Sequence, residues 1–169
     1  MSSFLRRFRR ASAESPSVVE APPEPVEVEV TLWTASGSRQ ASARIPAGRR
    51  VSDLLNDPVA TELFDMPLDE LLIVAPPEQP TDPARRLHRP GKLIHLSVGP
   101  YEVSGSAHVP AGAEAIAFLL RHNTRFVALR RATIDSGDAP EWDVVLVNLS
   151  QAHSTRNADA AGPPPPSRQ

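Results

Sequence analysis

Apolar and polar residues alternate along residues 26–32, where Val26, Val28, Val30 and Leu32 are separated by Glu27, Glu29 and Thr31. This period of two predicts a β-strand with one apolar face. Residues 35–38 (Ala-Ser-Gly-Ser) have the composition of a turn, so residues 39–45 are expected to return as the second strand of a hairpin. Pro46 ends this strand because proline donates no backbone hydrogen bond.

The same pattern returns 64 positions later, where residues 90–119 resemble residues 26–55. The most similar pieces are Ala-Arg-Ile-Pro-Ala-Gly at 43–48 and Ala-His-Val-Pro-Ala-Gly at 107–112. The similarity indicates an internal duplication, and duplicated units usually bury a face against each other. The identical pairs are Leu32/Leu96, Ser42/Ser106, Ala43/Ala107, Pro46/Pro110, Ala47/Ala111, Gly48/Gly112 and Leu55/Leu119.

In both copies a short helix is expected after the hairpin. The second copy repeats the hairpin in residues 93–98 and 101–109, with a turn at Gly99-Pro100. Apolar residues at helical spacing then predict one helix around residues 51–55 and another over 113–121.

Beyond the helices the two copies diverge. Residues 126–134 and 143–149 predict two further strands joined by a turn at 135–138, whereas the first copy offers residues 71–74 as its third strand. Residues 92–98 are expected to close the first unit and also to open the second. The predicted fold is therefore α+β and mostly β, with two tandem hairpin–short helix–strand–strand units fused into one body. Each unit alone, at about 60 residues, would be marginally stable.

Composition sets the boundaries of these units. Residues 1–11 are a basic amphipathic segment, and residues 12–24, rich in Pro and Glu, are expected to be a disordered linker. Residues 25–88 form the first repeat unit and residues 89–156 the second. Residues 157–169 end in four consecutive prolines, which predicts a disordered or polyproline II tail.

Four segments of the second copy resemble a small uncharacterised bacterial β-rich domain family. That family's pattern runs through a strand, G-x-I-H-x-P-x-G, a short helix ending near Leu-Asn, R-F-x-x-L and a hydrophobic strand ending near Asn. The resemblance covers about residues 93–152, and residues 30–75 are a degraded copy that lacks the Arg-Phe pair. It supports the fold, and it implies no activity because the family has none established. The matching segments are Ser-Gly-Ser-Ala-His-Val-Pro-Ala-Gly (104–112), Phe-Leu-Leu-Arg-His-Asn (118–123), Arg-Phe-Val-Ala-Leu (125–129) and Val-Leu-Val-Asn (145–148).

Composition also excludes much chemistry. The chain has no Cys and a single Lys, Lys92, which rules out disulfides, thiolate catalysis, Cys-ligated zinc and a P-loop lysine. It contains no G-x-G-x-x-G, G-x-S-x-G or H-E-x-x-H motif. We therefore predict no catalytic, cofactor-binding or metal-binding residues, and a protein that is not an enzyme. The histidines, which are not at metal-ligand spacing, are His88, His95, His108, His122 and His153.

Two groups of charged residues are candidate surfaces. Eight acids and no base lie between residues 51 and 82, which favours a solvated acidic surface over a paired-carboxylate site. Acids at 135–143 lack the order of a calcium loop and indicate a hairpin turn. Arg121, Arg125, Arg130 and Arg131 form a basic cluster that would suit phosphate or an acidic partner, or only solvated edges of strands and helices.

The N-terminal segment has the clearest functional pattern. On a helical wheel Phe4 and Phe8 share one face with Leu5 at its edge, and the basic residues occupy the other side. Such a helix suits a membrane surface, an acidic protein groove or an organelle-targeting peptide, and an incidental chain start is the remaining alternative. The basic residues are Arg6, Arg7, Arg9 and Arg10.

Together these features predict a non-catalytic cytoplasmic adapter or scaffold without a cofactor. Its body would bind an unidentified protein partner by a sheet edge or charged face, and residues 1–11 would dock reversibly, including at the anionic inner face of a membrane. The alternative is a small-barrel nucleic-acid-binding regulator that uses the cluster from Arg121 to Arg131. The net charge of −2 argues against bulk nucleic-acid binding.

Overall fold

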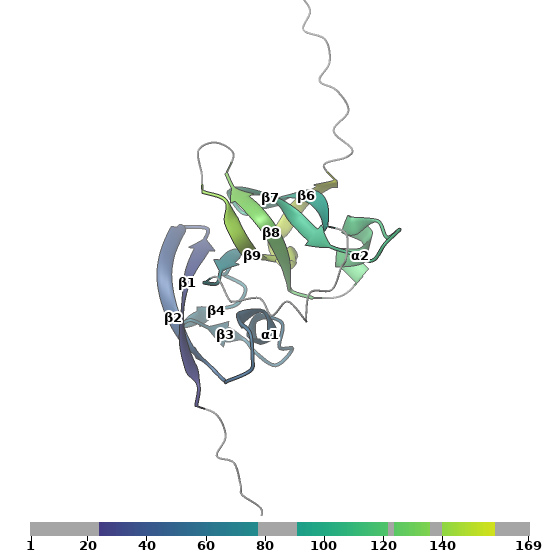
Figure 1. Ribbon diagram of the computed structural model, residues 1–169. Helices are drawn as coiled ribbons and strands as arrows, with labels where there is room; N and C mark the ends of the chain where they lie inside the picture. Colours follow the sequence, from purple (N-terminus) through teal and green to yellow (C-terminus); the bar gives the residue numbers. More distant parts are fainter. Residues whose placement is uncertain (1–23, 78–90, 122–123, 136–139, 158–169) are drawn as a thin grey trace, which may run out of the picture.

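The computed structural model describes residues 24–77, 91–121, 124–135 and 140–157, and its main element is one eight-stranded sheet (Figure 1). The order of strands is β10-β6-β7-β8-β9-β5-β1-β2, and each pair of neighbours is antiparallel. The mostly β, α+β fold predicted from the sequence is confirmed. The strands of this sheet are β1 (Val26–Thr34), β2 (Gly37–Ile45), β5 (Ile73–Ala75), β6 (Gly91–Val98), β7 (Tyr101–His108), β8 (Phe126–Ile134), β9 (Trp142–Asn148) and β10 (Ala152–Asn157).

Short elements complete the fold. Helix α1 (Val51–Leu55) follows the first hairpin, and helix α2 (Ala115–Arg121) follows the second. A short 3₁₀ helix, η2 (Leu149–Gln151), joins β9 to β10. A separate small hairpin is formed by β3 (Glu62–Leu63) and β4 (Met66–Pro67). Its turn holds Phe64 and Asp65 at φ of 59° and 57°, as a type I′ turn requires, and no sequence pattern had indicated it.

The repeat seen in the sequence is also a repeat in the structure. Thr34 pairs with Gly37 at the end of the first hairpin, and Val98 pairs with Tyr101 at the end of the second, 64 residues later in both strands. Gly48 and Gly112 both have φ of +80°, each two residues after a proline that accepts a hydrogen bond across the turn. The order β5-β1-β2 of the first unit thus matches the order β10-β6-β7 of the second.

The predicted connection between the units is wrong. Strand β6 does not close the first unit, because its two edges are taken by β7 and β10. The units join where β5 pairs with β9, at Ile73↔Val147 and Val74↔Leu146. Strand β10 has the polar sequence Ala-His-Ser-Thr-Arg-Asn, so no apolar alternation announced it. Asn157, predicted to begin the tail, is the last residue of this strand.

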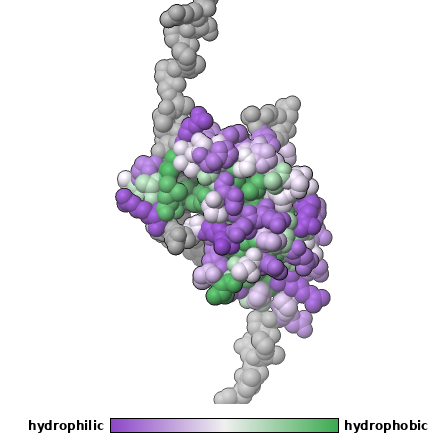
Figure 2. Space-filling model, turned by 180° about the vertical axis from the view of Figure 1, so that it is seen from behind, coloured by the Kyte–Doolittle hydropathy of each residue, from purple (hydrophilic) through white to green (hydrophobic). Residues whose placement is uncertain are grey.

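Two hydrophobic cores lie on opposite sides of the junction. One contains Val51 and Leu55 of α1, and the other contains Ala115 and Leu119 of α2. Successive residues of the junction strands alternate between them, as strand geometry requires: Ile73 and Val147 belong to the α2 core, and Val74 and Leu146 to the α1 core. This double burial explains why residues 71–75 are an uninterrupted apolar run. The outer surface seen from behind is mostly hydrophilic, with apolar patches between the charged residues (Figure 2).

Candidate functional site

Asn56, just after α1, ties the first unit to the second. Its Oδ1 accepts a hydrogen bond from the backbone N–H of Phe126 (2.7 Å), and its Nδ2 donates to the carbonyl oxygen of Phe126 (2.9 Å). The side-chain amide thereby satisfies both backbone groups of that residue, as a neighbouring strand would. The ring of Phe126 is buried in the α1 core, so β8 begins anchored on the first unit.

Asn148 makes a second connection and is fully buried. Its Nδ2 donates to the carbonyl oxygens of Leu71 (2.8 Å) and Leu68 (3.3 Å). Its Oδ1 accepts from the backbone N–H (3.1 Å) and the hydroxyl (2.6 Å) of Ser150. A buried amide with these bonds is satisfied, so its role is structural.

Aromatic residues meet at the hairpin ends of the two units. The Trp33 and Trp142 rings lie edge to face with centroids 5.3 Å apart. The Tyr101 hydroxyl donates to the carbonyl oxygen of Thr34 (3.0 Å). Burial, and secondarily the charge of Asp135, raise the pKa of Tyr101 above its usual value. These contacts hold β7 and β9 of the second unit against β1 of the first.

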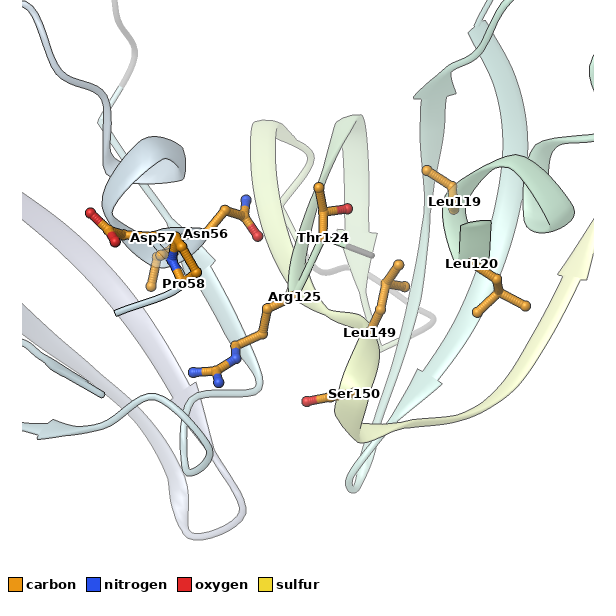
Figure 3. Close-up of a pocket in the computed structure, with 10 residues that line it drawn as sticks. Asn56, Asp57, Pro58, Leu119, Leu120, Thr124, Arg125, Leu149 and Ser150 are labelled. Atoms are coloured by element: carbon orange, nitrogen blue, oxygen red, sulfur yellow. The ribbon is translucent and has the colours of Figure 1, made fainter. Parts of the chain in front are cut away.

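A cleft of about 410 Å³ lies between the ends of α1 and α2 (Figure 3). Pro58 lines it from the first unit, Leu119 and Leu120 line it from α2, and the Arg125 side chain extends across it toward the first unit. Its volume is that of a small-molecule pocket. Two polar side chains on its wall, Asn56 and Ser150, make the hydrogen bonds given above, and Asp57 and Thr124 also line it.

Three of the four arginines of the predicted basic cluster lie beside an acid. Arg125 lies 3.9 Å from the carboxylate of Asp69, Arg130 lies 3.8 Å from Asp143, and Arg131 lies 3.2 Å from Glu141. Arg121 is exposed in the last turn of α2. The role of this cluster as a partner surface stays a prediction.

The acids of the first unit also have local roles. Asp53 accepts a hydrogen bond from the backbone N–H of Arg50 (2.9 Å) at the start of α1. Asp57 accepts from the N–H of Val59 (3.1 Å) and forms an ion pair with Arg49 (3.5 Å). Among the described residues, no three or more His, Asp or Glu side chains gather closely enough to hold a metal ion.

Lys92, the only lysine of the chain, and His95 both lie on β6 in the second hairpin. Lys92 Nζ donates to the carbonyl oxygen of Ala113 (2.6 Å), which ties β6 to the turn before α2. His95 Nδ1 lies 2.6 Å from the Ser104 hydroxyl across the strand pair. His95 and His108 are out of register in the hairpin, because His95 faces Ser104 and His108 faces Gly91. His88 and His122 lie outside the described residues.

The predicted docking residues Phe4, Leu5, Arg6, Arg7, Phe8, Arg9 and Arg10 all lie outside the described residues, as do most of the predicted linker and tail. Their role stays a prediction. In the described part of the chain, no helix is long and apolar enough to cross a membrane.

A candidate binding surface is the outer edge of β2, one of the two strands that end the sheet. This nine-residue strand ends the sheet and pairs with β1 alone among the described residues. The loop between β1 and β2 has two residues, so Thr34 and Gly37 form the first hydrogen-bonded pair. The hydrogen-bonded positions then alternate, and the N–H and C=O groups of the even-numbered residues point to the open edge. Those residues are Ser38, Gln40, Ser42 and Arg44, all exposed.

No sequence pattern singled out this edge or Asn56, whereas Asn148 ends the last segment that resembles the family pattern. The sequence held one signal for the edge, because the first copy lacks the Arg-Phe pair that begins β8 in the second. Among the described residues, the first unit likewise has no strand beside β2. Asn56 gave no signal, since its partner is 70 residues away.

Comparisons with known proteins add no assignment: the chain matches no protein-family model, no curated protein and no solved structure.

Proposed function

We propose that this chain is a non-catalytic adapter that recruits a protein partner through the open edge of β2. The observation that carries the proposal is a nine-residue edge strand with four exposed residues whose backbone groups face outward. Free strand edges pair readily with an extended segment of another chain, and main-chain hydrogen bonds then supply the affinity.

The side chains of β2 suit regulated rather than indiscriminate pairing. Arg39 and Arg44 are exposed, and the strand carries no acid. Charged side chains on an edge suppress self-association and aggregation. An edge that is long, proline-free and basic favours an acidic partner over a second copy of itself.

Residues 1–11 would supply a second, reversible contact. Their two phenylalanines and four arginines suit an anionic membrane surface or an acidic protein groove, and a short helix of this kind binds weakly alone. In this proposal the adapter works in the cytoplasm, including at the inner face of the membrane, and brings its partner there.

Site-specific crosslinking tests the proposal, because the chain has no cysteine of its own. A photo-crosslinker attached to Ser42→Cys would lie on the open edge, whereas the same reagent on Glu141→Cys would lie on an exposed residue of the second unit. We expect a protein from the native cell to crosslink at position 42 alone. The purified pair should then bind at a 1:1 ratio in calorimetry. Equal labelling from both positions, or no binding by the purified pair, would contradict the adapter function.

A further inference from the structure

The internal repeat shows what is missing beside β2. In the second unit, the outer edge of β7 is covered by β8, whereas the equivalent edge of β2 in the first unit carries no described strand. Since both hairpins have the same register, the uncovered position is defined residue by residue. Arg39, Gln40, Ser42 and Ala43 are equivalent to Val103, Ser104, Ser106 and Ala107, which pair with Ile134, Thr133, Arg130 and Leu129 of β8.

The first unit cannot fill this place with its own described residues. After α1 its chain forms the β3–β4 hairpin and continues into β5, which pairs with β1 and β9 instead. In the second unit, the backbone groups on the outer edge of β7 pair with β8. The C=O of Glu102, equivalent to Ser38, accepts from the N–H of Asp135 (2.8 Å). In the part of the chain that the structure describes, no strand pairs with the matching groups of β2.

We propose, resting on the adapter function above, that β2 accepts an extended acidic segment of the partner protein in the place that β8 takes beside β7. The added strand runs antiparallel to β2. Its alternate residues are apolar where they face the α1 core, and an acidic residue lies beside Arg44 on the opposite face.

The inner face of β2 carries small apolar side chains. Ala41 and Ala43 are half-buried and pack against the α1 core, as do Leu63 and Met66 of the small hairpin. Because both alanines are only partly buried, apolar residues on an added strand would extend this core. Burial of such side chains adds affinity to the backbone pairing.

One residue predicts how the added strand differs from β8. At Gly105, a Cβ would lie 2.9 Å from the Leu129 Cβ and 3.1 Å from the Ala132 Cβ, because β8 bulges there with Arg131 at φ of 50°. The first copy has Ala41 at this position. A bulged strand would therefore clash with Ala41, so the partner strand is regular.

Charge determines the chemistry of the partner. Arg44 replaces His108 and adds a cation to the exposed face of the edge, whereas Arg39, which replaces Val103, donates to the carbonyl oxygen of Phe64 (3.4 Å). Arg44 lies opposite Glu27 of β1, whose carboxylate also accepts from the Ser42 hydroxyl (3.3 Å). A residue of the added strand opposite Ser42 would be a diagonal neighbour of Arg44, where an acid is favourable and a base is not.

Two capped peptides test the site. The first has the sequence of β8, Phe-Val-Ala-Leu-Arg-Arg-Ala-Thr-Ile, and the second has glutamate in place of both arginines. We expect the acidic peptide to bind the full chain about fivefold more tightly at low salt, and the difference to shrink as salt rises. Binding should slow hydrogen exchange at the amides of Ser38, Gln40, Ser42 and Arg44, measured by NMR.

Variants of β2 separate edge pairing from other binding. Gln40→Pro removes an outward N–H, and proline is tolerated on an edge strand, so this variant should fold and lose the peptide. Gln40→Ala is its control and should bind as the natural chain does. If Gln40→Pro lowers the melting temperature strongly, Arg44→Glu serves as the second test. This variant should bind the peptide with arginines more tightly than the peptide with glutamates.

The remaining outcomes each decide for or against the strand site at β2 or the adapter function. Slow exchange at these four amides before any peptide is added would show that a segment of this chain or a second copy covers the edge, and would overturn the proposal. Peptide binding that protects β10 instead would also overturn it. If the crosslinked partner binds but protects no β2 amide, this inference fails while the adapter function stands. If the peptide protects β2 but no partner is found, the adapter function fails and the strand site stands.

Discussion

Asn56 and Phe126 are joined by two hydrogen bonds, one in each direction, although 70 residues separate them in the chain. The pair links the end of α1 to the start of β8, and thus the first repeat unit to the second. Its two hydrogen bonds add to the two residue pairs by which β5 and β9 join the units. The repeat units are consequently parts of one body.

Replacing Asn56 should test this link directly. Asn56→Ala leaves the N–H and C=O of Phe126 without their partner, and we expect a loss of about 2–4 kcal/mol in the free energy of unfolding, measured by urea denaturation. Gln40→Ala, which removes an exposed side-chain hydrogen bond to Thr31, should cost less than about 0.5 kcal/mol. Equal effects of the two variants would contradict the assigned role of Asn56.

Unfolding of the whole chain should occur in a single transition. Leu146 of β9 packs in the α1 core although it belongs to the second unit, so Leu146→Ala should lower the stability of both units together by about 2–5 kcal/mol. Calorimetry of the natural chain and the variant would measure this. Two separate transitions, with only one moved by the substitution, would show that the units fold independently.

Gly105 and Ala41 offer a comparison between the two copies. Gly105→Ala forces a Cβ against Leu129 and Ala132 and should destabilise the protein by about 1–3 kcal/mol. Ala41→Gly makes the reverse change at the equivalent position. It should cost only about 0.5–1 kcal/mol, from backbone entropy. Thermal melting of both variants checks the prediction, and a harmless Gly105→Ala would show that β8 does not approach β7 so closely.

The stability of the protein should fall in strongly alkaline solution because of Tyr101. Burial raises the pKa of its hydroxyl, so the folded state favours the neutral form. This stabilisation is present below the ordinary tyrosine pKa of about 10 and is lost as pH rises through the higher folded value. Tyr101 is the only tyrosine, so absorbance at alkaline pH reports its titration alone.

Tyr101→Phe provides the control for that measurement. The variant loses the hydrogen bond to Thr34, at a cost of about 0.5–1.5 kcal/mol near neutral pH. Its stability should then depend less on pH above 10 than that of the natural chain. A natural chain whose tyrosine titrates at the ordinary pKa would contradict the burial argument.

The N-terminal segment should act separately from the body. Phe4→Ser combined with Phe8→Ser removes the apolar face of the predicted docking helix, so it should release the protein from its site without changing the melting temperature. Replacement of Arg6, Arg7, Arg9 and Arg10 by Gln should have the same effect, more strongly at low salt, where charge is least screened. Fluorescence localisation and thermal melting measure the two quantities. A lower melting temperature with normal localisation would show that the segment is packed structure.

Local patterns in the sequence were enough to predict both hairpins, both helices and the strands of the core, but not β10 or the β3–β4 hairpin. Alternation along residues 26–32, the turn at Gly99-Pro100 and the repeated Pro-Ala-Gly all concern neighbours in the chain, and each appears in the structure. The repeat predicted two equivalent hairpin–helix units for the same reason, since similar local sequences adopt similar local structure. The polar strand β10 was missed because it pairs with β6 through backbone groups that every residue carries.

Only the tertiary structure decided how the units join and which edge stays open. The β5–β9 pairing, the Asn56–Phe126 bonds and the placing of Phe126 in the α1 core depend on contacts between residues far apart in the chain. The candidate site also depends on strand order: within the described ranges no strand lies beside the outer edge of β2, because the chain after α1 continues into β5 instead of returning beside it. Strand order is set by which long-range pairings bury the most apolar surface, and that competition leaves no periodic trace in the sequence of β2 itself.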